Sequence, residues 1–491
     1  MTKTKRIKGD ITEGPVLGKI IAYSVPLILT GILQLLYNAA DTIVAGRWAS
    51  DGEAALAAVG SCGALINLIV QLFMGLSVGA GVCVAQNYGA RRYDEVSKTV
   101  HTAVPAATIL GVIVSIFGFF AAETLLTWTG VEESVLAEAA PYMRAYMVGM
   151  PASMVYNYCA TMLRSTGDTA HPLIFLSVSG LVNVALNLVT VLGLGMGALG
   201  VGIATAVSTW LSMILILIFM MRTDTCMHLS LRKMHIYGDK LLQILRFGIP
   251  AGLQGCVFSL SNVLIQSSVN SFERYVVAGN TAAANIDSFI YTAMNAVYHA
   301  TLTFVGQNIG AKKYDRVPRI VGVCYGLVTV IGFIMGAGTI LFGRELLWLY
   351  APGNELAIEA GMKRLIIVGG PYLLCGLMEV GCGAMRGMGS SITPMVVSLV
   401  GSCASRILWI YTVFAAFPTT TVLYLSYPLS WTMTAIAHLL CWTLFLRHLR
   451  HKNGGSGGSG GTAEGYAAER ETETDETSEV GEACEVSGSA E

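Results

Sequence analysis

Long apolar runs separated by short polar segments dominate the chain. Runs with few or no charges, each long enough for the ~20-residue helix that crosses a bilayer, begin near positions 20, 55, 96, 136, 172, 197, 241, 278, 320, 358, 392 and 422. This pattern predicts an all-α polytopic membrane protein with twelve transmembrane helices. The composition agrees, because 54% of the 491 residues are hydrophobic and only 12% are charged, whereas soluble domains carry about 25% charged residues.

Basic residues are concentrated in every second connecting segment, as the positive-inside rule predicts for cytoplasmic loops. These segments hold Lys3, Lys5, Arg6, Lys8, Arg91, Arg92, Lys98, Arg164, Arg222, Arg232, Lys233, Lys312, Lys313, Arg316, Arg319, Arg386, Arg447, Arg450 and Lys452. The intervening segments carry acids, namely Asp51, Glu53, Glu132, Glu133, Glu273 and Glu355. We therefore expect a multi-pass protein of the cell (plasma) membrane with both termini in the cytoplasm.

Three short stretches recur in the same order in the two halves of the chain. "VAQNYGARRYD" at 84–94 returns as "VGQNIGAKKYD" at 305–315, "PLILTG" from Pro26 matches "PAGLQG" from Pro250, and "RSTGDTAHP" at 164–172 matches "RGMGSSITP" at 386–394. Six spans in each half keep the two halves in the same orientation. The repeats are therefore parallel, and we expect two six-helix bundles with a central cavity between them.

This repeat divides the chain into five predicted segments. They are a cytoplasmic N-terminal segment at 1–13, an N-lobe with helices 1–6 at 14–221, a basic cytoplasmic connector at 222–240, a C-lobe with helices 7–12 at 241–450, and a flexible linker with an acidic tail at 451–491. The last segment contains "GGSGGSGG" and a Thr/Glu-rich stretch. Such a composition cannot bury enough apolar surface to fold.

The sequence offers no sign of nucleotide chemistry or of a metal centre. It has no GxxxxGK(S/T) motif, and "GMGALG" at 195–200 fits GxGxxG only in a turn between two membrane helices, outside any βαβ unit. None of the eleven cysteines forms a CxxC pair, so we interpret them as packing residues. We expect no enzymatic activity, no cofactor and no nucleic-acid partner. An ion gradient, or the gradient of the substrate itself, must then supply the energy.

The first span carries a polar stripe that ends in its one buried acid. Gln34, Tyr37, Asn38 and Asp41 follow the spacing i, i+3, i+4 and i+7, which places them on one helix face. A charge at that depth costs at least ~2.5 kcal/mol unless it is paired or neutralised, so the stripe should face the bundle interior. Asp41 is a candidate coupling residue that would alternate between protonated and cation-bound forms. The alternative is a structural acid whose hydrogen bonds are satisfied by its neighbours.

Polar partners for this acid lie on later spans. Asn183 and Asn187 are one helical turn apart on the fifth span, Thr205 lies on the sixth, and Asn157 on the fourth is a weaker candidate. Together with Asp41 these oxygens form a hard-ligand set that suits a small cation such as Na⁺.

The second half does not repeat this acid. When the halves are aligned on their prolines, Asp41 falls on Ile265. The second half carries Asp287, Glu379 and Arg406 instead. A buried arginine needs an acid partner, so we expect Arg406 to pair with Glu379 or Asp287, either as a structural or gating pair or in contact with the substrate.

Residues 14–450 resemble the multidrug and toxic compound extrusion (MATE) family of the bacterial type. The resemblance rests on "ADTIVAGRW", on the paired "QNYGARRYD" and "QNIGAKKYD", and on "RSTGDT..P". It implies a V-shaped pair of bundles that exports organic cations and other amphipathic compounds by antiport with H⁺ or Na⁺. It also implies a site of a first-helix Asp, a fifth-helix Asn and Asp and a sixth-helix Thr, which fall here on Asp41, Asn183, Asn187 and Thr205.

Asn187 departs from the family pattern, which has an aspartate there. A site with one carboxylate should bind a monovalent cation more weakly, so proton coupling through Asp41 alone and coupling that includes Glu379 or Asp287 both remain open. The second-half acids of some relatives do not align, because Phe258 replaces the seventh-helix acid and Glu379 is displaced along its helix.

Three classes of function are compatible with this architecture to different degrees. Secondary active efflux of a small amphipathic or cationic molecule, by alternating access in a monomer, is the leading prediction. A flippase for lipid-linked oligosaccharides is the alternative, but it should have a strongly cationic central cavity, and Arg406 is the one mid-membrane base that the sequence offers. A channel or scaffold is poorly supported, because no repeated filter sequence occurs.

Overall fold

The computed structural model describes residues 11–49 and 52–454, and this part of the chain is helical without strands. The first half contains α1 (Val16–Trp48), α2 (Gly52–Gly89), α3 (Tyr93–Trp128), α4 (Glu133–Ser165), α5 (Ala170–Asn187), the π-helical turn η1 (Leu188–Gly193) and α6 (Gly197–Arg222). The second half contains η2 (Leu231–Lys233), α7 (Gly238–Val269), α8 (Arg274–Gly310), η3 (Tyr314–Arg316), α9 (Val317–Leu341), α10 (Gly343–Tyr350), α11 (Glu355–Arg364), η4 (Leu365–Gly369), η5 (Gly370–Tyr372), α12 (Leu373–Gly387), α13 (Ile392–Ser398), η6 (Leu399–Ala404), α14 (Ser405–Trp409), η7 (Ile410–Phe414) and α15 (Thr420–Gly454).

Ten of the described helical segments are long and apolar enough to cross a membrane. Two further helices, α4 with 33 residues and α8 with 37, exceed the ~20 residues that a span needs but are more polar. Both bury much of their length inside the protein, where polar side chains find partners. Together these segments account for the twelve predicted spans, and the all-α membrane class is confirmed.

The predicted domain boundaries are only partly covered. The described residues up to Trp442 form one compact unit, so the N-lobe at 14–221 and the C-lobe at 241–450 remain predictions. Residues 1–10, 50–51 and 455–491, which include most of the N-terminal segment and of the linker and tail, lie outside the described residues.

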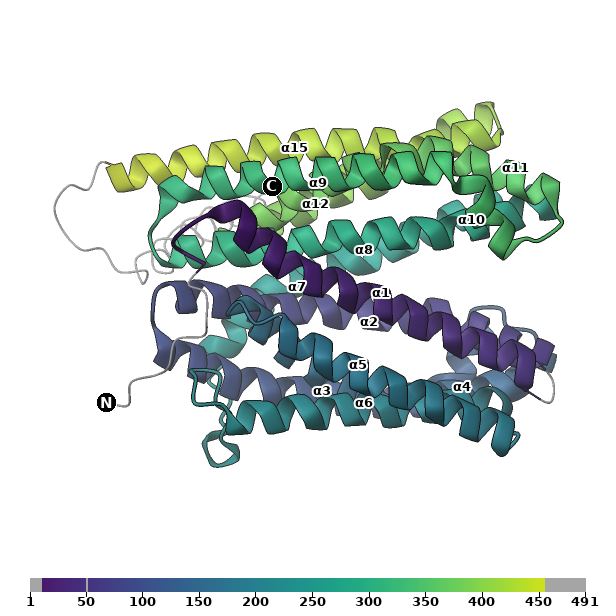
Figure 1. The fold of residues 1–491 in the computed structure, drawn as a ribbon, viewed down its shortest axis with the longest axis horizontal. Coiled ribbons are helices and arrows are strands. Elements are labelled where there is room, and N and C mark those ends of the chain that lie inside the picture. Colours follow the sequence, from purple (N-terminus) through teal and green to yellow (C-terminus); the bar gives the residue numbers. More distant parts are fainter. Residues whose placement is uncertain (1–10, 50–51, 455–491) are drawn as a thin grey trace, which may run out of the picture. The chain divides into compact units, whose positions relative to one another are not determined.

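Glycines bring the two halves into backbone contact along α2 and α7. A Cβ on Gly75 would lie 2.1 Å from the backbone nitrogen of Gly252, and one on Gly79 would lie 2.2 Å from the carbonyl oxygen of Ile244. Gly248 faces Leu76 in the same way, with 2.8 Å to its carbonyl oxygen. Small residues four positions apart on each helix are the usual means of close helix packing in membranes. Figure 1 shows the two helices side by side.

α1 contacts both halves of the protein. Near its start, the Tyr23 hydroxyl lies 2.9 Å from Thr303 Oγ1 of α8, and a Cβ on Gly31 would lie 2.2 Å from Thr292 of the same helix. Its later turns pack on α5, and Figure 1 shows its oblique course between these neighbours. A change in α1 is therefore felt in both halves.

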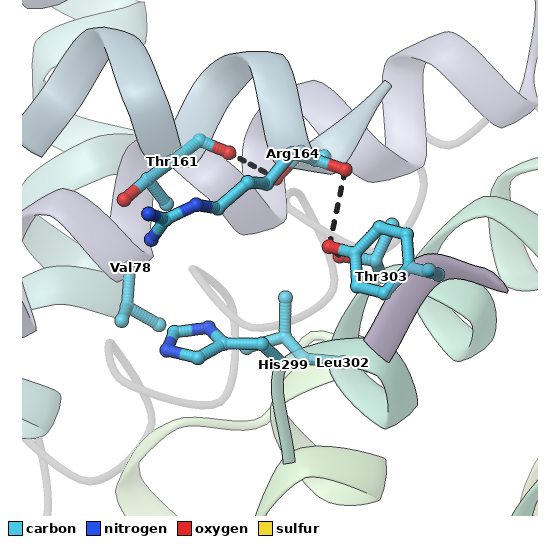
Figure 2. A pocket seen from close by; sticks show the side chains of 8 residues that line it. Val78, Thr161, Arg164, His299, Leu302 and Thr303 are labelled. Atoms are coloured by element: carbon cyan, nitrogen blue, oxygen red, sulfur yellow. Dashed lines mark hydrogen bonds between the residues drawn. The ribbon is translucent and has the colours of Figure 1, made fainter. Parts of the chain in front are cut away.

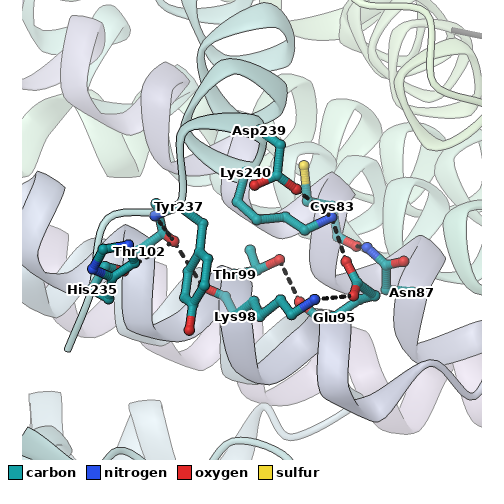
Figure 3. A network of polar contacts seen from close by, with 10 residues as sticks. All are labelled: Cys83, Asn87, Glu95, Lys98, Thr99, Thr102, His235, Tyr237, Asp239 and Lys240. Carbon is teal, nitrogen blue, oxygen red and sulfur yellow. Dashed lines mark hydrogen bonds and ion pairs between the residues drawn. The ribbon is translucent and has the colours of Figure 1, made fainter. Parts of the chain in front are cut away.

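The connector between the halves is tied to α3. Figure 3 shows Lys240, which is buried, paired with Glu95 of α3 at 2.5 Å and with Asp239 at 3.4 Å. The backbone nitrogen of Tyr237 donates to Thr102 Oγ1 at 3.2 Å. The connector predicted at 222–240 thus ends in the first turn of α7, which begins at Gly238.

Candidate functional site

The acid of α1 and three side chains of α5 and α6 form a closed hydrogen-bonded ring. Asn187 Nδ2 donates to Asp41 Oδ1 at 2.5 Å and to Asn183 Oδ1 at 3.4 Å. Asn183 Nδ2 donates to Thr205 Oγ1 at 3.5 Å, and Thr205 Oγ1 donates to Asp41 Oδ2 at 3.4 Å. All four residues predicted for cation coupling are therefore brought together, while their role stays a prediction.

The local fold of α5 buries the amide end of this ring. Asn187 is fully buried and Asn183 is 5% exposed. The π-helical turn η1 begins directly after Asn187, and such turns are frequent at functional sites. Thr190 on this turn contacts the Gly200 carbonyl oxygen of α6 at 3.0 Å, which holds the end of α5 against α6. Asn187 Oδ1 is buried without a hydrogen-bond partner among the described residues, so one oxygen remains available.

Of the other residues in the predicted polar stripe, Tyr37 packs on α5, whereas Gln34 and Asn38 are exposed. The Tyr37 ring lies so close to α5 that a Cβ on Gly180 would be 1.9 Å from it, and the Tyr37 hydroxyl donates to the Ser177 carbonyl at 3.2 Å. Gln34 and Asn38 are exposed, and Gln34 Nε2 contacts Asn38 Oδ1 at 3.4 Å. These two side chains do not contribute to the ring.

The fourth-helix candidate lies apart from the ring. Asn157 Nδ2 donates to the Ser153 carbonyl oxygen of its own helix at 2.8 Å. It therefore satisfies its amide within α4 and, in the described part of the chain, makes no hydrogen bond to the acid of α1 or its partners.

The ring presents donors to both carboxylate oxygens of Asp41. Hydrogen bonds of this kind stabilise an ionised carboxylate. A threonine hydroxyl is also an acceptor, so Thr205 can receive a proton from a protonated Asp41 after rotation of its hydroxyl hydrogen. The arrangement can hold the acid in either state with small movements of its neighbours.

In the second half the structure corrects the predicted ion pair. Asp287 pairs with Arg364, whose Nη2 lies 3.1 Å and whose Nε lies 3.2 Å from Asp287 Oδ2. Arg364 Nη1 also donates to Asn280 Oδ1 at 2.8 Å, and all three side chains are buried. In the sequence, Arg364 is a base near the end of a predicted span, with nothing to mark it as buried. Only the packing of α11 on α8 shows that it is the partner of Asp287.

Arg406 pairs with neither of the acids expected for it. Its Nε donates to Ser430 Oγ at 2.9 Å, and its guanidinium lies 4.5 Å from the ring centroid of Tyr427. Glu379 has no basic group within ion-pair distance among residues 11–49 and 52–454. The prediction that Arg406 pairs with Glu379 or Asp287 is wrong, because aromatic and hydroxyl groups of α15 stabilise this cation.

Arg386, which the sequence places among the bases of a connecting segment, lies in the last turn of α12. Its side chain is buried, with 6% exposure. Its Nη1 donates to the Tyr298 hydroxyl at 2.5 Å and its Nη2 to Gln254 Oε1 at 2.8 Å. Its position inside the span that begins near 358 was the feature of the sequence that could have indicated its burial.

A small cavity lies where α1, α4 and α8 meet. Figure 2 shows Arg164 and His299 on opposite sides of this cavity. Tyr23 and Thr303, which bond to each other, also line it. The volume is about 10 Å³, which is the size of a single water. It is therefore no binding site for an organic substrate.

The fold defines a class of proteins before any relative is considered: multi-pass helical membrane proteins with an internal repeat and ionisable groups inside the membrane. Residues 26–189 and 250–437 match the family model MatE. The chain therefore belongs to the MATE family of transporters.

Similarity to individual relatives agrees with this family. The chain is 27% identical over 389 residues to "Probable multidrug resistance protein YoeA" of Bacillus subtilis, covering 77% of this chain and 82% of that protein. It is 22% identical over 397 residues to an "FAD transporter" of Shewanella oneidensis, covering 79% and 86%. A solved outward-facing conformation of a multidrug resistance MATE family transporter superposes with a TM-score of 0.84 at 21% identity, covering 91% of this chain and 99% of that one.

Proposed function

We propose that this protein is a secondary active efflux transporter of the cell membrane that exports organic cations and other amphipathic drugs by antiport with protons. The observation that carries the proposal is the ring around Asp41, a carboxylate inside the first span with donors on both oxygens. The names of relatives such as YoeA, a probable multidrug resistance protein, support the substrate class.

The geometry of the ring supports H⁺ over Na⁺ as the coupling ion. Asn187 directs only its amide nitrogen into the ring, whereas Asn183 contributes both its nitrogen and its oxygen. A sodium ion needs oxygen ligands, so the Asn187 amide would have to reverse and its bond to Asp41 would be lost. A proton needs only the rotation of the Thr205 hydroxyl. The absence of a second carboxylate at position 187 points the same way.

Asp41 is placed to couple its protonation to a change of conformation. It lies on α1, which contacts α5 and α6 around the ring and α8 near Tyr23. Protonation removes the charge that orders the ring and alters how α1 is held between the halves. Each tenfold difference in proton affinity between the two facing states biases the equilibrium by about 1.4 kcal/mol.

The alternative, a flippase for lipid-linked oligosaccharides, is less well supported. Such a protein needs accessible cations for a diphosphate. Arg364 is neutralised by Asp287, Arg386 is held by Tyr298 and Gln254, and Arg406 lies against Tyr427. These buried bases are occupied by internal partners.

Transport in proteoliposomes tests the proposed function directly. Vesicles that contain the purified protein and ethidium receive an imposed pH gradient, a sodium gradient or neither. We expect ethidium movement with the pH gradient and little with sodium alone. Movement that depends only on sodium would contradict proton coupling, and ethidium movement no faster than in protein-free vesicles under any gradient would contradict organic-cation efflux.

Replacing Asn187 with Asp should change the ion that drives transport. The second carboxylate would lie beside Asp41, where Asn187 Nδ2 now donates, and two charges with the oxygens of Asn183 and Thr205 make a stronger site for a monovalent cation. We expect sodium to drive ethidium transport in Asn187→Asp at least about tenfold better than in the wild type, a gain of about 1.4 kcal/mol in binding. Asn157→Asp, on α4 and apart from the ring, is the matched control and should stay independent of sodium.

A further inference from the structure

A basic cavity lies where α2 and α8 end. It has a volume of about 320 Å³ and is lined by Thr12, by residues 89–92 and by residues 310–313. The two loops are equivalent in the repeat, and each contributes two cationic side chains: Arg91 and Arg92 from one half, Lys312 and Lys313 from the other. No acidic residue is among these lining residues.

The two loops share an unusual backbone conformation. Arg91 and Lys312, with φ of 59° and 57°, are the only residues other than glycine with positive φ in the described chain. Each occupies the position after the helix at which glycine is usual, and the next residue closes the turn, with Arg92 N bonded to Asn87 O and Lys313 N to Asn308 O, both at 2.9 Å. Both halves therefore keep a cationic side chain where helix termination alone favours glycine.

The cavity exists because the two halves touch at this end. A Cβ on Gly89 would lie 2.0 Å from the Gln307 carbonyl oxygen, and one on Gly310 would lie 1.9 Å from that of Gln86. The same glutamines bond across the halves, Gln86 Nε2 to the Gly387 carbonyl at 3.0 Å and Gln307 Nε2 to the Ser165 carbonyl at 2.7 Å. If α2 and α8 separated here, the two pairs of cations would separate with them.

We propose that this cavity binds the phosphate headgroup of an anionic phospholipid, held by both repeats at once, and that the bound lipid stabilises the conformation closed at this end. Four cations that converge from two loops repel one another, and a phosphate placed between them offsets that repulsion. Lys313 also meets one carboxylate outside the lining, with its Nζ 3.3 Å from Glu13 Oε1. Lipid fits better than a soluble anion because the positive-inside rule places this end at the cytoplasmic leaflet, where anionic lipids lie.

The conformational part of this proposal rests on the proposed function, since it assumes alternation between two states. The binding part does not, because it concerns the protein in the closed state that the structure describes. Binding is therefore measured without a gradient and without a transported compound. A failure of ethidium transport would leave the binding result standing, and a failure of binding would leave the transport result standing.

Glycine substitutions provide a clean test of the site. Arg91→Gly/Lys312→Gly removes one cation from each loop and supplies the residue that best fits the positive φ, so the variant should fold at least as well as the wild type. The matched control is Arg232→Gly/Lys233→Gly, which removes two exposed cations from η2, outside the cavity lining. Affinity for dioctanoyl phosphatidylglycerol is measured on the full chain in neutral detergent, with dioctanoyl phosphatidylcholine and inorganic phosphate as comparison ligands.

We expect the wild type and the control pair to bind the anionic lipid equally, and the cavity pair to bind it about tenfold or more weakly, in line with the contribution of each base near a membrane surface. Hydrogen exchange at residues 84–92 and 305–313 should slow when the lipid binds. Equal weakening in both pairs, or phosphatidylcholine bound as tightly as phosphatidylglycerol, would overturn the site. Inorganic phosphate bound as tightly as the lipid would overturn the assignment to a headgroup, and unchanged exchange would overturn the clamp between the halves.

Discussion

We expect Asp41→Asn to lower proton-driven efflux in proteoliposomes by at least about 100-fold, because the substitution removes the proton-binding group instead of changing its affinity. The substituted amide keeps the size of the side chain, and its oxygen can still accept from Asn187 or Thr205, so the ring should persist. Only the exchangeable proton is lost. The initial rate of ethidium movement under an imposed pH gradient is the measurement.

The control for this substitution is an acid of the same half that lies outside the ring. Glu123 on α3 is 57% exposed and pairs with Arg144. An exposed pair of this kind contributes ~1 kcal/mol or less, so Glu123→Gln should transport at the wild-type rate. Proton-driven efflux that survives in Asp41→Asn would refute the coupling role of Asp41. Equal loss in both variants would show that any lost carboxylate impairs the protein.

A second readout separates coupling from binding of the transported molecule. If Asp41 carries the proton, Asp41→Asn should still allow ethidium to move down its own concentration gradient, because the cavity and the two halves are intact. If Asp41 instead contacts the organic cation, downhill movement should fall together with proton-driven movement. Both rates are measured on the same vesicles, which removes differences in reconstitution.

Periodicity predicted only part of the first-half ring, for a clear physical reason. Residues at i, i+3, i+4 and i+7 share a helix face whatever the fold, so the sequence placed Tyr37 and Asp41 together. It could not place Asn187 and Thr205 beside Asp41, because that requires the packing of α5 and α6 on α1. The resemblance to a family supplied this step, and the structure places the four ring side chains within hydrogen-bond reach of one another.

The second-half site was predicted poorly for a different reason. The sequence shows that Arg406 is buried but not what it faces, and an aromatic ring such as Tyr427 can stabilise an arginine as an acid does. Arg364 was overlooked because a base near a span end is indistinguishable in sequence from a loop base. The repeat itself was clear, yet the reciprocal bonds of Gln86 and Gln307 across the halves depend on tertiary contact.

Arg364→Met should destabilise the protein by about 3–5 kcal/mol, because it leaves the carboxylate of Asp287 buried without its partner. Asp287 and Arg364 are 5% and 8% exposed in their side chains, so water cannot readily replace the lost interaction. Asn280 would lose its donor as well. The midpoint of thermal unfolding in detergent, compared with that of the wild type, measures the loss.

The double variant Asp287→Leu/Arg364→Met distinguishes a structural pair from two independent groups. Replacing both members of a buried pair by apolar side chains is often neutral, whereas removing one is costly, so the double variant should recover most of the stability that Arg364→Met loses. Asp287→Leu with Arg406→Met is the matched control, and its two effects should add, because Arg406 bonds Ser430 and stacks on Tyr427 instead of meeting this acid. Additive stability effects in the first pair and coupled effects in the second would indicate that Asp287 pairs with Arg406, as the sequence alone predicts. Recovery in the first pair alone would establish that the second half uses the buried pair of Asp287 and Arg364 to hold α8 against α11.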